Sequence, residues 1–382
     1  MIFYMGLNMR KDDRLRQLAE NIIKNSVELK KGETIYIEAF GESTRDLLDE
    51  FIIAATKAGG VPFYMFNDNA FARDFVSNAS AKQIEEYGKI HAGLMEKSQA
   101  YIGLRGNDDL FALADVNEKQ MTLYQKHFMI PVHHALRVPK TKWCVLRYPN
   151  NTMAATSKMS TRAFEDFYFN ACLLDYKKMK KAMEPLVKLM KKTDKVRIKA
   201  SETDLTLSIK GIGAQPCFGD RNIPDGEVYS APVKNSINGV VQFNTDTTYN
   251  GEFFSNIRLE FKNGKIIKAK SLANDARFQK ILDLDAGSRY IGEFALGVNP
   301  HITHPILDIL FDEKISGSFH MAIGNSYDDM DNGNKSAIHW DLVQIQTPEY
   351  GGGEIWFDDV LIRKDGRFVI KELECLNPEN LK

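Results

Sequence analysis

The residues best suited to chemistry gather in the C-terminal half of this sequence. The segment SAIHWDLV places His339 and Asp341 two positions apart, and at that spacing two side chains of a β-strand point to the same face. That face would also carry core residues such as Val343, so an unpaired carboxylate beside an imidazole would be costly to bury. A divalent cation is one suitable partner for the pair. The alternative is a strand near a sheet edge, where both side chains meet water.

Other segments of the same region offer further ligands. FDEKISGSFHMAIGNSY contains His320 and then Tyr327, whose hydroxyl can ligate a metal or stabilise an oxyanion. Glu293 lies in the apolar run YIGEFALG, and Glu227 follows a Pro-Asp-Gly turn in IPDGEVYSAP. Each glutamate alone fits a metal ligand no better than an exposed strand residue or an ion-pair partner. With the histidine–aspartate pair, they are enough ligands for two divalent ions if one carboxylate bridges them, and two such ions could activate a shared water.

The elements that must position these residues are predicted to be β-strands. From residue 195 onward, short alternating runs are separated by turns, and FKNGKII and RKDGRFV carry the Asn-Gly and Asp-Gly pairs typical of hairpins. The first half instead alternates helical and strand-like segments in a β-α-β pattern. We therefore expect an α/β N-terminal domain with a mostly parallel sheet over residues 1–180. We expect a β-rich α+β catalytic domain over residues 181–382.

Composition narrows the classes of partner and location. Fifty basic and 51 acidic residues give a net charge of −1 without long runs of one sign, which argues against binding nucleic acid or an anionic membrane. No segment approaches the roughly 18 consecutive apolar residues of a membrane-spanning helix. The N-terminal MIFYMGLNMR is too short for a signal peptide core. The four cysteines are widely spaced: Cys144, Cys172, Cys217 and Cys375. They match neither a zinc-binding pair nor a disulfide framework, so a reducing, cytoplasmic location is expected.

Other histidines and motifs are weaker candidates. His133 and His134 are adjacent, and adjacent residues of a strand point apart, so we interpret them as structural or as lining a cleft. His301 and His304 lie between two prolines, which favours a loop over a ligand-bearing helix. The triplet at 351–353, GGG, lacks the lysine of a phosphate-binding loop. The sequence also has no G-x-S-x-G, the motif of one class of serine hydrolases.

Several of these segments occur together, and in the same order, in one known family. NIPDGEVYSAP, IGEFALGVNP, LFDEKISGSFHMAIGNSY and SAIHWDLV resemble the signature blocks of the aminopeptidase T and aminopeptidase S family, the thermophilic-type two-metal leucyl aminopeptidases. The resemblance covers nearly the whole chain, including LAENIIKNSVELKKGETIYI near the N-terminus and RYPNNTMAATSKMSTRAFEDF in the centre. One departure is the short, acidic DDMDNGNK after Tyr327, where members of the family often have a longer connection. It puts substrate specificity, more than the chemistry, in question.

The resemblance implies a role for each residue that matches a block. The implied metal ligands are Glu227, Glu293, His320, His339 and Asp341. Glu293 would bridge the two ions and take part in catalysis, and Tyr327 would donate a hydrogen bond to the oxyanion at the edge of the site. Glu313, in the same block as His320, would be a further ligand or an outer carboxylate. The implied activity is the release of N-terminal residues from short peptides by a water that two divalent ions activate.

The same resemblance implies a homodimer in which the N-terminal domain helps to close the cleft, which favours short peptides over folded proteins. Two alternatives stay open: a non-catalytic peptide-binding homologue, and a related two-metal dipeptidase or amidase. The complete ligand set argues against the first alternative. A peptide with a blocked N-terminus distinguishes the second, since an aminopeptidase should not cleave it. The metal stays open between zinc, cobalt and manganese, because carboxylate and imidazole ligands suit all three.

Overall fold

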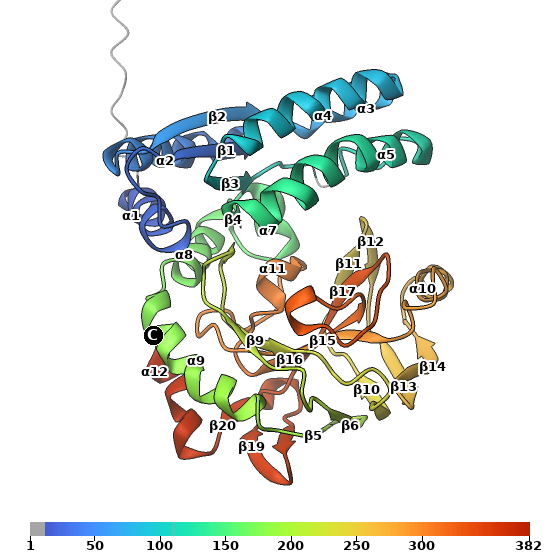
Figure 1. The fold of residues 1–382 in the computed structure, drawn as a ribbon. Coiled ribbons are helices and arrows are strands. Elements are labelled where there is room, and N and C mark those ends of the chain that lie inside the picture. Colours follow the sequence, from blue (N-terminus) through green and yellow to red (C-terminus); the bar gives the residue numbers. More distant parts are fainter. Residues whose placement is uncertain (1–11, 110) are drawn as a thin grey trace, which may run out of the picture. The chain divides into compact units, whose positions relative to one another are not determined.

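The computed structural model describes residues 12–109 and 111–382, so the segment MIFYMGLNMR lies outside the described residues. The chain forms two compact units (Figure 1). The first comprises Met1–Leu173 together with Gly219–Ile223, and the second comprises Leu174–Phe218 together with Pro224–Lys382. The domain boundary that we placed at residue 180 stays a prediction. In the described part of the chain, every helix is too short or too polar to span a lipid bilayer.

A parallel sheet forms the core of the first unit. Its strands lie in the order β2-β1-β3-β4-β8, and each neighbouring pair is parallel. Their bounds are β1 (Thr34–Phe40), β2 (Val61–Asn67), β3 (Ala100–Arg105), β4 (Lys142–Arg147) and β8 (Asn222–Ile223). The inner strands β1 and β3 are buried almost throughout, as expected of parallel strands covered on both faces. The predicted α/β region with a parallel sheet is therefore confirmed.

Helical segments connect these strands. Their bounds are α1 (Asp13–Asn21), η1 (Ile22–Ser26), η2 (Glu42–Thr44), α2 (Arg45–Lys57), α3 (Asn69–Asn78), α4 (Ala81–Glu96), α5 (Glu118–Tyr124), η3 (Gln125–Arg137), α6 (Val138–Lys140), α7 (Asn151–Thr156) and α8 (Thr161–Cys172). Helix α4 begins with a capping box, in which Ser80 and Gln83 each accept a hydrogen bond from the other's backbone N–H. His133 and His134 lie in the π-helical segment η3, so our interpretation of them as strand residues is wrong. The helix still separates them, because His133 is buried and His134 is exposed.

Antiparallel strands build the second unit. Its sheets have the orders β14-β13-β10-β6-β5-β18-β19-β20 and β17-β16-β15-β9-β7, with a separate pair β11-β12. The strand bounds are β5 (Lys195–Ala200), β6 (Thr203–Ser208), β7 (Gln215–Cys217), β9 (Glu227–Ser230), β10 (Asn238–Gln242), β11 (Thr247–Tyr249), β12 (Glu252–Phe254), β13 (Arg258–Lys262), β14 (Lys265–Lys270), β15 (Ile291–Gly297), β16 (Ser318–Gly324), β17 (His339–Ile345), β18 (Glu354–Phe357), β19 (Val360–Lys364) and β20 (Arg367–Phe368). This confirms the predicted β-rich C-terminal region.

Turns and short helices complete the second unit. The predicted Asn-Gly and Asp-Gly hairpins are confirmed, because the turn residues Asn263 (φ 50°) and Asp365 (φ 49°) and the glycines after them have positive φ, as tight hairpin turns require. The helical segments are α9 (Tyr176–Met190), α10 (Asp275–Leu282), α11 (Ile309–Asp312), η4 (Asp328–Met330), η5 (Pro348–Tyr350), η6 (Lys371–Leu376) and α12 (Pro378–Leu381). His301 and His304 lie in the connection between β15 and α11, so the predicted loop is confirmed.

Candidate metal centre

The strands β17, β16, β15 and β9 of the five-stranded sheet of the second unit are labelled in Figure 1. Their register places all the predicted ligands on one face of that sheet. Across its strands, Glu293 pairs with Ala322, which in turn pairs with Asp341. His320 of β16 pairs with Ala295 of the neighbouring strand β15. Directly paired residues of a sheet point to the same face, so the longer polar side chains stand beside alanines, with Val343 as the second neighbour of His320. The small residues leave room above the sheet between the carboxylates and the imidazoles.

Glycines complete this pattern at the rim of the same face. Glu227 pairs with Gly297, and His339 pairs with Gly324. The register of β15 shifts next to Glu293, and a β-bulge of this kind re-aims the side chains beside it. Gly292 lies at that shift, and a Cβ there would stand 2.1 Å from the carbonyl oxygen of Asn325. The bulge that sets the direction of the glutamate therefore depends on a glycine.

Two groups of possible ligand atoms share Glu293. One contains Glu227, Glu293 and His320, the other contains Glu293, His339 and Asp341, and within each group the atoms lie within 4.8 Å of one another. His320 Nε2 is 3.2 Å from Glu227 Oε2 and 3.5 Å from Glu293 Oε1. His339 Nε2 is 3.2 Å from Glu293 Oε2 and 3.6 Å from Asp341 Oδ1. The structure thus brings the five predicted ligands together, with one oxygen of Glu293 facing each histidine.

The donor atoms of this cluster fit divalent metal ions. Among the described residues, Glu227 Oε2, His339 Nε2 and Asp341 Oδ1 are buried without a hydrogen-bond partner. Leaving such atoms unsatisfied is costly, and carboxylate oxygen and imidazole nitrogen are common ligands of zinc and related ions. The Nδ1 of His339 lies 2.8 Å from the carbonyl oxygen of Asn325, which can only accept. In a neutral ring the proton is therefore on Nδ1, and Nε2 presents its lone pair to the cluster.

The electrostatics of the cluster also favour cations. Burial alone would lower the pKa of His320, but its hydrogen bond to Glu293 and the charge of Glu227 outweigh burial and raise that pKa to about 9. Burial would raise the pKa of Glu293, but its close contacts with the imidazoles of His320 and His339 lower it to about 2. Without metal, protons on the imidazoles balance the buried carboxylates. The same negative potential attracts metal ions.

Of the other residues near this cluster, some were predicted from the sequence and one was not. Tyr327 is 47% exposed, and its ring centroid lies 4.6 Å from that of His339, so it stands at the edge of the cluster as expected. Glu313 forms a further ligand group with His320 and Asp341. Sequence analysis missed Lys314, whose ammonium group lies among the carboxylates of this site. The block FDEK does contain this lysine, but no pattern indicates that its side chain is buried.

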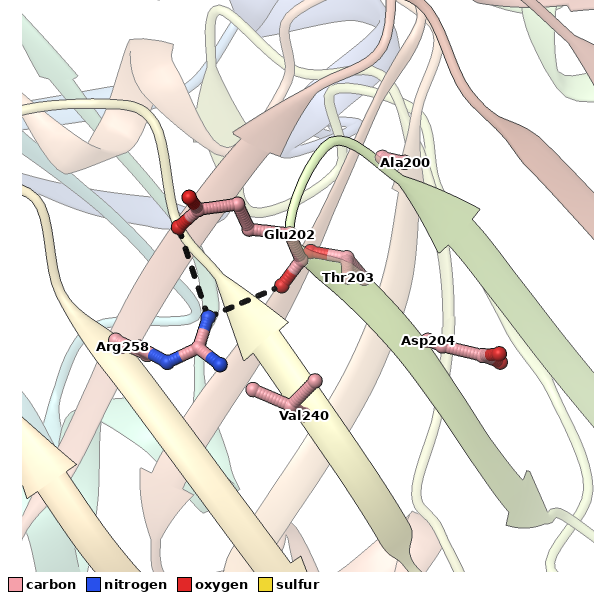
Figure 2. A pocket seen from close by; sticks show the side chains of 6 residues that line it. All are labelled: Ala200, Glu202, Thr203, Asp204, Val240 and Arg258. Carbon is pink, nitrogen blue, oxygen red and sulfur yellow. Dashed lines mark hydrogen bonds and ion pairs between the residues drawn. The ribbon is translucent and has the colours of Figure 1, made fainter.

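A separate hollow lies on the larger sheet of the second unit (Figure 2). It has a volume of about 450 Å³. The residues that line it are Ala200, Glu202, Thr203, Asp204, Val240 and Arg258. Arg258 donates a hydrogen bond to the backbone oxygen of Glu202 at 3.3 Å, and its guanidinium lies 3.6 Å from the Glu202 carboxylate. This hollow contains none of the predicted ligands and is distinct from the candidate metal centre.

Comparison with known proteins decides the family. The sequence profile of one family, described as thermophilic metalloprotease (M29), matches residues 11–368. This chain belongs to that family. Aminopeptidase AmpS of Bacillus subtilis (strain 168) is 32% identical over 158 residues, which is 38% of either chain. Aminopeptidase 2 of Geobacillus stearothermophilus is 24% identical over 411 aligned positions, which cover 94% of this chain and 96% of that one.

Solved structures share the fold at lower identity. Wild-type AmpT from Thermus thermophilus has a TM-score of 0.79 and 20% identity, with 94% of this chain and 99% of that one covered. A 2,5-dihydroxypyridine dioxygenase from Pseudomonas putida KT2440 has a TM-score of 0.59 and 13% identity over 94% of this chain and 98% of that one. Because two differently named enzymes share it, the fold alone does not fix the reaction.

Family membership confirms several predictions. The resemblance to the aminopeptidase T and S family, the fold class and the enzyme class, a metal-dependent aminopeptidase, are all confirmed. The donor set described above agrees with the use of divalent metal by a metalloprotease. The number of ions, their identity and the roles of individual residues are proposals.

Proposed function

We propose that this metalloprotease removes N-terminal residues from short peptides with the help of two divalent ions. The proposed ligands are Glu227, Glu293, His320, His339 and Asp341. The observation that carries this proposal is the position of Glu293, which belongs to two ligand groups and turns a different oxygen toward each histidine. A bridging carboxylate between two ions needs this arrangement.

The charge of the site supports two ions rather than one. The carboxylates of the cluster are Asp225, Glu227, Glu293, Glu313 and Asp341. When all five are ionised, the ammonium of Lys314 balances one of them. Two divalent ions would balance the other four with both histidines neutral. A buried site with this many carboxylates is stable only when counter-charges are present.

The chain's own residues supply the remaining parts of the reaction. Bound divalent ions contribute Lewis-acid polarisation of a carbonyl and a lowered pKa of water. Tyr327, at the exposed edge of the cluster, donates its hydroxyl proton in a hydrogen bond to the oxyanion that develops on the peptide. Glu313 shares a group with His320 and Asp341 without being a proposed ligand, so its carboxylate is placed to carry a proton to the leaving amine.

The edge strand β2 supports a homodimer. β2 is the outer strand of the parallel sheet, so within residues 12–109 and 111–382 the backbone groups along its outer side have no strand partner. Val61, Tyr64 and Phe66 on this strand are 56%, 52% and 41% exposed. An exposed apolar edge is a site for pairing with a second chain. A dimer measured by light scattering, and its dissociation by Phe66→Glu, would support this interface. We also expect the protein to be cytoplasmic.

Hydrolysis of a leucyl chromogenic amide tests the proposed function. The chelated enzyme is assayed before and after addition of zinc, cobalt or manganese, with wild type and with Glu293→Gln. We expect metal to restore activity in the wild type only, and a substrate with a blocked N-terminus to stay intact. Cleavage of the blocked substrate would instead favour the amidase alternative. If no metal restores activity on any free-amine substrate, the non-catalytic alternative replaces the proposal.

A further inference from the structure

A buried lysine lies against the proposed metal centre. Lys314 is only 1% exposed and is among the largest side chains of the chain that are fully buried. Its Nζ lies 2.5 Å from Glu227 Oε1, 2.8 Å from Glu313 Oε1 and 3.4 Å from Asp225 Oδ1. An ammonium group has three donors and no acceptor, and here three carboxylates surround it. Lys314 is therefore a permanent cation inside the site.

The fold itself fixes the backbone that carries this lysine. Lys314 follows α11, where its N–H donates to the carbonyl of Phe311 at 2.9 Å. On the other side, the N–H of Asn299 donates to the carbonyl of Lys314 at 3.0 Å. Gly297 allows the close approach of this segment, because a Cβ there would stand 2.4 Å from the carbonyl oxygen of Ile315. The position of the ammonium group thus does not depend on its carboxylate partners alone.

The contact with Lys314 gives the two carboxylate oxygens of Glu227 different surroundings. Oε1 accepts the hydrogen bond from the lysine, whereas Oε2 is buried without a hydrogen-bond partner and faces His320 Nε2 at 3.2 Å. An unrestrained carboxylate could offer both oxygens to one ion. Outer partners of this kind fix the orientation of a metal ligand. Here the outer partner leaves one oxygen for the metal.

A fourth possible ligand group includes Glu227. Cys217, Asp225 and Glu227 have ligand atoms within 4.8 Å of one another, and Cys217 pairs directly with Glu227 across β7 and β9. Thiolate and carboxylate together are a good donor set for zinc. The ammonium of Lys314 contacts two of these three residues. A cation tethered to the chain thus stands beside the group that would otherwise compete for a metal ion.

We propose that Lys314 is a positioning residue of the metal centre, which holds Glu227 as a ligand through Oε2 alone and keeps metal ions out of the Cys217–Asp225–Glu227 group. This inference rests on the proposed metal centre. Removal of the ammonium would take away the cation that contacts both Glu227 and Asp225 in a buried place, and these carboxylates would then favour another cation. The cysteine would enter the metal coordination only in that case.

Cobalt substitution gives a readout that does not depend on activity. In the full-length wild type, we expect a cobalt spectrum of nitrogen and oxygen ligands. In Lys314→Met, we expect a new thiolate-to-cobalt charge-transfer band, which the added Cys217→Ser substitution removes. The affinity for the first ion should fall by about 10–100-fold, the usual cost of losing an outer partner of a ligand. Lys314→Arg keeps the charge and should show no thiolate band.

A matched control separates this effect from the loss of any lysine ion pair. Lys335 is exposed and lies 3.1 Å from Asp328, so Lys335→Met should keep the wild-type spectrum and affinity. A wild-type spectrum and affinity in Lys314→Met would overturn the proposal, whatever happens to its activity.

If Lys314→Met does not fold, a measurement on the wild type still tests the proposal. X-ray absorption of the zinc-loaded wild type should show only nitrogen and oxygen neighbours. A zinc–sulfur distance of about 2.3 Å would overturn the role assigned to Lys314 while leaving the metal centre intact. A wild type that binds no metal would overturn the proposed function itself, and the role of Lys314 with it.

Discussion

Each unit of the molecule buries a glutamate in the middle of a sheet, but the two glutamates have different neighbours. Glu38 in β1 is 2% exposed, and Glu293 in β15 is 3% exposed. Glu38 accepts hydrogen bonds from the hydroxyls of Tyr36 at 2.9 Å and Tyr101 at 2.6 Å, one on each oxygen. Glu293 faces two histidines within a group of further carboxylates. The first carboxylate is satisfied within its own unit, whereas the second belongs to a cluster whose carboxylates outnumber its one fixed cation, Lys314.

The pKa values of buried histidines differ between the two units in the same way. Burial lowers the pKa of His133, in the first unit, to about 4, in spite of the charge of Glu38. In the second unit, carboxylates outweigh burial and raise the pKa of His320 to about 9. Without bound metal, a buried imidazole is therefore neutral in the first cluster and cationic in the second. The comparison teaches that burial of acids and histidines does not by itself mark a metal site; an excess of unbalanced carboxylates does.

The largest expected effect is the loss of activity in Glu293→Gln. A bridging ligand should matter at least as much as an oxyanion-hole donor, whose loss costs about 10³-fold in rate, or about 4 kcal/mol. We expect this loss in kcat/KM together with a lower metal content. Glu349→Gln changes an exposed glutamate of the same unit and should leave both values unchanged. A Glu293→Gln enzyme with full activity and full metal content would remove the contrast with Glu38.

The sequence predicts much of this site because strands impose simple rules. His339 and Asp341 were assigned to one face from their spacing alone, and the register confirms that both pair with residues of one face of β16. The resemblance of the signature blocks to the aminopeptidase family then predicts the other ligands. The spacing gave no information on the bulge at Gly292, which depends on the contact with a carbonyl far along the chain. Contacts between distant segments are set by tertiary packing, which local patterns do not encode.

The residues that the sequence analysis missed or misassigned also depend on contacts between distant segments. Lys314 reads as an ordinary surface lysine next to Glu313, and only the approach of its loop to β15 makes it a buried cation. The sequence analysis treats His133 and His134 as neighbours in a strand, yet they lie in a helix that contains Pro131. Proline inside a helix is disfavoured locally, so the tertiary context overrides local preference there.

Acid should destabilise the first unit through His133. Its pKa in the folded protein, about 4, is below the ordinary value of 6.5, so the unfolded chain takes up the proton first. The stabilisation is complete above pH 6.5 and is lost as the pH falls through 4, which amounts to about 3 kcal/mol. His133→Gln should flatten this part of the pH profile of unfolding, whereas His134→Gln, at the adjacent exposed position, should not. Equal profiles in both variants would contradict the assignment.

Removal of metal should destabilise the second unit selectively. An ion present at about 100 times its dissociation constant stabilises the folded state by about 2.7 kcal/mol. Chelation should therefore speed hydrogen exchange in β15, β16 and β17 and leave β1 and β3 unchanged. If the amides of both units lose protection equally, the first unit also depends on metal, and the two clusters are more alike than we infer.

Glu38→Gln should have the smallest effect and tests the other side of the comparison. The substitution removes a charged acceptor of two hydroxyl hydrogen bonds, and hydrogen bonds to charged groups contribute about 2 kcal/mol. Burial would raise the pKa of the Glu38 carboxyl, but the charge of Arg105 and the hydrogen bonds from the two tyrosine hydroxyls lower it. The loss should therefore be greatest near neutral pH, where the carboxylate is charged. Urea unfolding measures this loss, while metal content and the cobalt spectrum should match the wild type. A Glu38→Gln protein of normal stability that binds less metal would show that the buried acid of the first unit serves the metal site rather than its own fold.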